Sequence, residues 1–150
     1  MKIIVPHTEK LSEILIAVCQ SLGFTPELRY MDRVNSYHEL LSELWHQKET
    51  FIIIEQDVLP VPDIIQEMWN CGHRWCGAQF LIAGNYMQQP LGCSKFSAAM
   101  IEACPTMIDD LPIKRWYSLD GQIYTAGHEA QVKLHKHGKV IHLNHMHFPE

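Results

Sequence analysis

The sequence has 150 residues, of which 47% are hydrophobic and 19% charged, and its net charge at pH 7 is −5 with histidine counted as neutral. These proportions are typical of a globular domain and exclude a disordered tail, a collagen-like repeat and a coiled coil. The acidic balance argues against a nucleic acid as partner, because binding to its backbone requires clustered lysine and arginine. We expect one domain spanning residues 1–150.

The five cysteines are odd in number and scattered, and no secretory leader is recognisable in the sequence. This pattern favours reduced thiols and a cytoplasmic location. The longest apolar stretches, such as residues 51–54, are far shorter than the ~20 residues that a membrane-spanning helix requires. We therefore expect no transmembrane segment, and the sequence leaves the oligomeric state open.

Strands and helices are expected to alternate in the N-terminal half. The run at residues 51–54 is apolar without polar alternation, which is typical of a central strand covered by helices on both faces. We expect strands at 3–5 (ending at Pro6), 27–31, 51–54, 75–82 and 132–143, and helices at 11–22, 36–45, 63–69, 94–103 and 121–126. This order predicts an α/β domain whose central sheet is mostly parallel and flanked by helices.

Two carboxylates follow the strand at residues 51–54. Side chains alternate on extended backbone, so Glu55 and Asp57 can point to one side while Gln56 points to the other. In open α/β sheets the ligand site lies outside the carboxyl ends of the strands. Two converging carboxylates repel each other unless a cation is present, and oxygen ligands suit Mg²⁺ or Mn²⁺. The same spacing is equally compatible with two solvated acids that cap the next turn.

The order of these parts resembles the GT-A fold of nucleotide-sugar glycosyltransferases, particularly the family 2-like members, over nearly the whole chain. The segments that carry the resemblance are Ile3-Ile4-Val5-Pro6, Glu55-Gln56-Asp57, Leu91-Gly92-Cys93-Ser94, residues 116–120 and a C-terminal strand with histidines. The resemblance implies a metal-dependent, inverting enzyme in a short form. Such an enzyme moves a sugar from a nucleotide-diphosphate donor to an acceptor hydroxyl with the help of Mn²⁺ or Mg²⁺.

On the donor side, the resemblance places Glu55 and Asp57 at the family's D-x-D motif. Asp57 would be the metal ligand and Glu55 would contact the ribose. The loop with Pro6 and Thr8 would contact the nucleotide base, and Asp32 would contact the base or the ribose. From the residues alone, Asp32 could instead pair with its neighbour Arg33.

On the acceptor side, the resemblance makes Asp120 the general base, which takes the proton of the attacking hydroxyl. Gly92 and Cys93 would form a glycine loop just before a helix, near the acceptor and the donor sugar. Trp116 would form a platform for the acceptor, although a tryptophan of this kind is more often buried in the core. Asp120 could also cap a helix that begins at Gly121.

The C-terminal histidines supply the last ligand that the resemblance implies. His142 follows two apolar residues and is our first choice for the metal, with His145 and His135 as alternates. Sequence does not decide which face of the strand meets the metal. For any single histidine, a solvated or core position is also compatible with the pattern.

Two other functions remain open at this point. One is a zinc site in which Cys71 and Cys76 join some of the histidines, although the cysteine spacing lies at the edge of the usual range, and His142 and His145 are one residue closer than usual pairs. The other is a nucleotide-binding or regulatory module that keeps the fold without turnover.

Overall fold

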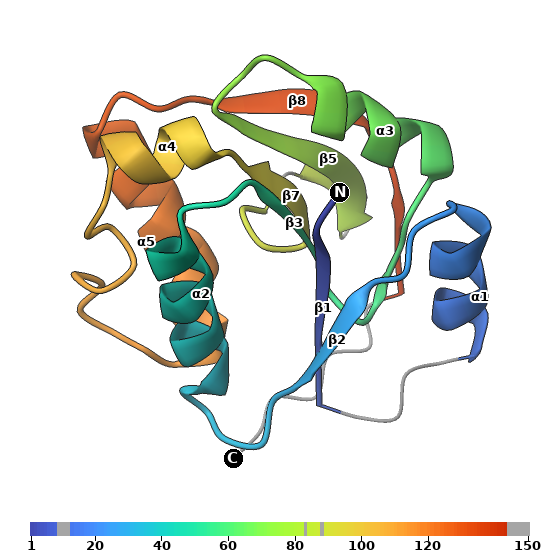
Figure 1. Cartoon of the computed structure of the whole chain (residues 1–150), viewed down its shortest axis with the longest axis horizontal. Coiled ribbons are helices and arrows are strands. Elements are labelled where there is room, and N and C mark those ends of the chain that lie inside the picture. Colours follow the sequence, from blue (N-terminus) through green and yellow to red (C-terminus); the bar gives the residue numbers. More distant parts are fainter. Residues whose placement is uncertain (9–12, 83, 88, 144–150) are drawn as a thin grey trace.

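The computed structural model describes residues 1–8, 13–82, 84–87 and 89–143 (Figure 1). The elements are β1 (Ile3–His7), α1 (Glu13–Ser21), β2 (Glu27–Tyr30), α2 (Ser36–Gln47), β3 (Phe51–Ile54), β4 (Val58–Leu59), α3 (Pro62–Asn70), β5 (Trp75–Ile82), β6 (Asn85–Met87), β7 (Cys93–Phe96), α4 (Ala98–Ala103), α5 (Trp116–Glu129), β8 (Leu134–Lys139) and β9 (Ile141–His142). Among the described residues, no helix is both long and apolar enough to cross a membrane.

A seven-stranded sheet runs in the order β2-β1-β3-β7-β5-β6, and β8 also pairs with β5. The strands β2, β1 and β3 are parallel, whereas β7 is antiparallel to both β3 and β5. The strand β8 runs parallel to β5, and β6 antiparallel to it. The sheet is therefore parallel in its N-terminal half and mixed overall, which confirms the predicted α/β class.

Helices cover both faces of the sheet. Figure 1 shows α2, α4 and α5 on one side and α1 and α3 on the other. Alternate residues of β3 divide between the two layers: Phe51 and Ile53 join the core under α2 and α5, whereas Ile52 and Ile54 join the core under α1 and α3. All four side chains are at most 1% exposed, as expected for the central strand that the apolar run predicts.

The first strand is longer than predicted, because it continues through Pro6 to His7. The carbonyl of Lys2 accepts from β3, and the carbonyl of His7 accepts from Met31 beyond β2. Since backbone groups alternate along a strand, Pro6 faces the β3 side, where pairing ends at Ile4. The missing N–H of proline therefore costs no ladder hydrogen bond.

Residues 93–96 form the strand β7, and the prediction that Ser94 caps a helix is wrong. The helix α4 begins later, where the side chain of Ser97 accepts a hydrogen bond from the backbone N–H of Met100 at 3.1 Å. Both serines suit a helix start locally. Residues 93–96 are extended because they pair with β3 on one side and with β5 on the other.

Candidate active site

The candidate site lies at the carboxyl end of β3. The N–H of Glu55 donates to the carbonyl of Gly92 at 3.0 Å, and the N–H of the adjacent Leu91 donates to Oδ1 of Asp120 at 2.9 Å. These two bonds connect the end of β3, the segment before β7 and the helix α5. The structure thereby brings Glu55, Asp57 and Asp120 to one end of the sheet, although their carboxyl oxygens do not all lie within 4.8 Å of one another.

Burial governs the electrostatics of this acidic group. Burial, then the charges of Asp120 and Asp57, raise the pKa of Glu55 well above its usual range, and the side chains of Tyr37 and Trp116 partly oppose this shift. Burial also raises the pKa of Asp120 to about 6, against the hydrogen bond from Leu91, which lowers it.

Asp57 and His142 lie side by side. His142 Nε2 is 3.5 Å from Asp57 Oδ2, and the two side chains are only 9% and 2% exposed. The short antiparallel pair of β4 and β9 sets this contact, because Val58 is in register with His142 and the N–H of Leu143 donates to the carbonyl of Asp57 at 2.7 Å.

The surroundings of Asp57 fit a cation. Neither of its carboxylate oxygens accepts a hydrogen bond among the described residues, although both are buried. A buried carboxylate that accepts no hydrogen bond is costly, and a bound cation reduces that cost. A carboxylate oxygen and an imidazole nitrogen are ligands that Mn²⁺ accepts, so the residues present fit the metal that the resemblance implies. His145, the alternate ligand, lies outside the described residues.

Thr8, the residue that follows β1, is held by a residue that we did not predict to act there. Gln56 accepts from the N–H of Thr8 at 2.8 Å and donates to Oγ1 of Thr8 at 3.0 Å. The alternation expected of extended backbone does not apply to Gln56, because residues 55–58 form a turn in which the N–H of Val58 donates to the carbonyl of Glu55 at 3.0 Å. Its role could have been anticipated, because an amide at the end of a central strand can satisfy a backbone group of the adjacent loop.

Asp32 is not part of the acidic group. It accepts a hydrogen bond from Oγ of Ser36 at 2.8 Å and lies 3.4 Å from Nε of Arg33, and the Ser36 bond in particular lowers its pKa. Nearby, the ring of Tyr30 is 65% exposed and its centroid lies 5.7 Å from that of His7. This aromatic pair at the ends of β1 and β2 was also missed, because neither residue stands out in the sequence.

The predicted acceptor-side roles of Gly92, Cys93 and Trp116 are corrected by the structure. Gly92 precedes a strand, and its role in the structure is packing, because a Cβ there would come within 2.6 Å of the Phe80 ring. Cys93 and Trp116 are 0% and 1% exposed, and the Trp116 ring packs edge-on against Tyr37 at 4.7 Å. Neither side chain is presented to an acceptor, since both are used in the core.

Asp120 does not cap a helix at Gly121, because α5 already begins at Trp116 and Asp120 lies in its second turn. The N–H of Trp116 donates to the carbonyl of Val34, which ties the start of the helix to the segment before α2. This earlier start turns Asp120 toward Leu91 and leaves it half-buried.

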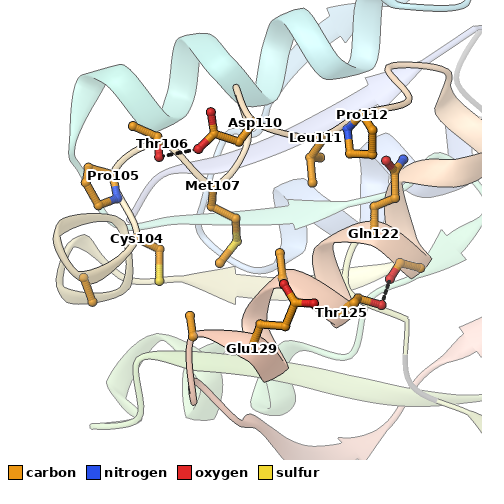
Figure 2. A pocket seen from close by; sticks show the side chains of 14 residues that line it. Cys104, Pro105, Thr106, Met107, Asp110, Leu111, Pro112, Gln122, Thr125 and Glu129 are labelled. Carbon is orange, nitrogen blue, oxygen red and sulfur yellow. Dashed lines mark hydrogen bonds between the residues drawn. The ribbon is translucent and has the colours of Figure 1, made fainter.

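The cavity shown in Figure 2 is separate from the candidate active site. It has a volume of about 700 Å³ and lies between α5 and the segment after α4. None of the candidate site residues lines it, and its carboxylate Asp110 accepts a hydrogen bond from Thr106 at 2.6 Å. The site at the end of β3 therefore stands apart from this cavity.

Replacing Glu55 with glutamine is expected to stabilise the protein at neutral and alkaline pH. Since the folded state holds the Glu55 proton more tightly than the unfolded state, stability is lost as pH rises through the range between the two pKa values. Above the pKa of Asp120, about 6, any further loss of stability comes mainly from ionisation of Glu55.

Urea denaturation at pH 6 to 9 measures this effect. The free energy of unfolding should fall with pH in the wild type and change less in Glu55→Gln. The control Glu49→Gln changes a side chain that is 70% exposed and should keep the wild-type profile. Identical profiles for all three proteins would contradict the assignment.

No protein-family model matches the sequence, and no curated protein matches it significantly. Solved structures do resemble it. A glycosyltransferase involved in the glycosylation of the major capsid of PBCV-1 superposes with a TM-score of 0.63 at 12% identity, covering 97% of this chain and 93% of that one. The catalytic domain of Drosophila β1,4-galactosyltransferase 7 superposes with a TM-score of 0.58 at 13% identity, covering 90% of this chain and 63% of that one. The chain therefore has a GT-A-like fold, the fold of nucleotide-sugar glycosyltransferases.

Proposed function

We propose that this protein is a glycosyltransferase that moves a sugar from a nucleotide-diphosphate sugar to an acceptor hydroxyl, with inversion at the anomeric carbon. The observation that supports this most is the contact of Asp57 with His142 at the end of β3, beside Glu55 and Asp120, in a chain with a GT-A-like fold.

Asp57 and His142 are the residues proposed to hold a divalent cation. When bound, the cation would neutralise negative charge on the diphosphate leaving group. An imidazole ligand favours Mn²⁺ over Mg²⁺, which prefers oxygen ligands. Because Asp57 is only 2% exposed, binding requires a neighbouring element to move.

Asp120 is proposed to act as general base. It takes the proton as the acceptor oxygen bonds to the anomeric carbon and the bond from that carbon to the diphosphate breaks. A general base works best when its pKa is near the working pH. With a pKa of about 6, Asp120 is mostly ionised at neutral pH yet more basic than an ordinary aspartate. The hydrogen bond from Leu91 to Oδ1 fixes one oxygen and leaves Oδ2 for the acceptor.

The nucleoside is proposed to bind at the ends of β1 and β2. The exposed ring of Tyr30, next to His7, offers a stacking surface for a base. Thr8, which would meet the base, is held by two hydrogen bonds with Gln56 just beyond the end of β3. Glu55 is proposed to contact the ribose, whose hydroxyls can exchange hydrogen bonds with a carboxyl in either protonation state.

A donor screen tests this function. We expect one nucleotide sugar of a panel, with Mn²⁺, to release its nucleoside diphosphate, and release should depend on the metal. The released nucleotide is measured by chromatography, and the product anomer by NMR. Binding of a nucleotide without release from any donor, with or without simple sugar acceptors, would instead identify a non-catalytic nucleotide-binding module.

A further inference from the structure

Two cysteines and three histidines gather at the end of the sheet opposite to the candidate active site. Strand register places them there: Ile54, next to the acidic group, is opposite Cys93, whereas Phe96, at the other end of β7, is opposite Trp75 at the start of β5. The sequence separates the members widely, since Cys71, His73 and Cys76 lie around the start of β5 and His135 and His137 lie on β8.

The ligand atoms of this cluster lie close together. The Sγ atoms of Cys71 and Cys76 and a ring nitrogen of His137 lie within 4.8 Å of one another, and so do the ligand atoms of Cys71, His73 and His135. Around a tetrahedral zinc ion, with bonds of about 2.0 to 2.3 Å, neighbouring ligand atoms are roughly 3.3 to 3.8 Å apart. Each group of three therefore needs to contract by about 1 Å to meet a metal. The two groups share Cys71, and His135 would have to move toward Cys76 and His137 to join them around one ion.

Backbone structure fixes most of these residues. Cys71 ends α3 and its N–H donates to the carbonyl of Met68 at 3.3 Å. Cys76 is in register with His135 on β8, and His137 follows two residues later on the same side of that strand. The rings of His135 and His137 meet edge to face with centroids 5.0 Å apart. His73 is exposed and stacks on the outer side of this group, at 3.9 Å from His135.

One buried nitrogen of the cluster lacks a partner that a metal would supply, and a buried lysine lies beside the cluster. Nε2 of His137 is buried and has no hydrogen-bond partner among the described residues. Lys95, which is in register with Cys76 on β7, is 2% exposed and donates to the carbonyl of Cys71. The ion pairs of the described residues include none between Lys95 and a carboxylate. A zinc ion bound by two thiolates is neutral overall, so it would add no net positive charge beside this buried ammonium.

We propose that Cys71, Cys76, His135 and His137 bind a structural zinc ion. Two thiolates and two imidazoles are a common ligand set for such sites, and two thiolates balance the charge of the ion. His135 is preferred to His73 as the fourth ligand because it is half-buried and shares a strand with His137. The ion would join the end of α3 to β8, and β8 leads directly to β9 and His142.

Metal analysis of the full chain, purified without a polyhistidine tag, tests this proposal. We expect about one zinc per chain after dialysis, and none in the double variant Cys71→Ala with Cys76→Ala. Cys104→Ala, which removes a buried free cysteine outside the cluster, should retain the zinc. Asp57→Asn should also retain it, which separates this site from the proposed donor metal. A wild-type chain without zinc, or a double variant with undiminished zinc, would overturn the proposal.

Two further measurements keep the test decisive if the double variant does not fold. Cobalt added to the metal-free wild type should give the absorption of a tetrahedral site with thiolate ligands, and an octahedral spectrum without thiolate bands would refute the site. His135→Ala should weaken zinc binding at least tenfold and His73→Ala should not. The reverse result would overturn the ligand set.

Discussion

Replacing Asp120 with asparagine is expected to slow sugar transfer by about 10² to 10⁴, the usual contribution of a general base. Asparagine keeps the shape of the side chain and can still accept the hydrogen bond from Leu91, but it cannot take a proton. Donor binding should therefore change little, and the loss should appear in kcat. Initial rates with the donor identified by the screen, together with calorimetric titration of that donor, separate the two effects.

The pH profile adds a second readout for Asp120. The wild-type rate should rise with pH through an apparent pKa near 6, where Asp120 loses its proton. This rise should be absent from the residual activity of Asp120→Asn. The matched control Asp110→Asn changes an exposed aspartate beside Thr106 and should leave both rate and profile unchanged. If Asp120→Asn keeps the full rate, another group is the base.

Replacing Asp57 with asparagine is expected to abolish the stabilisation of the protein by Mn²⁺ and a nucleoside diphosphate. A ligand at 100 times its Kd stabilises the folded state by about 2.7 kcal/mol, which for a chain of this size corresponds to a rise in Tm of roughly 5 to 10 °C. Asp57 supplies the charged ligand, so its neutral analogue should lose nearly all of this rise. Thermal unfolding with and without Mn²⁺, nucleotide and chelator measures the effect.

The chain offers a close control for this experiment. Asp109 also contacts a histidine, with His46 Nε2 at 2.9 Å from Asp109 Oδ2, but both side chains are at least 40% exposed. Asp109→Asn should keep the full metal-dependent rise in Tm, whereas His142→Ala should reduce it. An unchanged rise in Asp57→Asn would remove Asp57 from the proposed donor site.

Much of the fold could be predicted from local patterns. The apolar run at 51–54 predicts the buried central strand, and Glu55 and Asp57 at its end lie, as expected, at the same end of the sheet as Asp120. The contact of Asp57 with a histidine near the C-terminus is harder to predict, because the pairing of β4 with β9 decides it. The sequence leaves several C-terminal histidines as possible neighbours of Asp57, and the register of β4 with β9 places His142 beside it.

The errors have one physical cause, which is that pairing between distant segments overrides local signals. Ser94 has the chemistry of a helix cap, yet it lies in a strand paired on both sides. Trp116 was expected to contact an acceptor but fills the core against Tyr37. Likewise, the spacing of Cys71 and Cys76 alone is weak evidence for a metal site. The pairing of β8 with β5 brings His135 and His137 close to them.

The late position of β8 and β9 in the chain has a consequence for how the protein reaches its active form. Both strands pair with partners far back in the sequence, β8 with β5 and β9 with β4. We expect these pairings to form late in folding, because closing such long loops is entropically costly. The central strands can therefore assemble while Asp57 still lacks His142. A nascent chain would then carry its fold before Asp57 and His142, the residues proposed to hold a cation, come together.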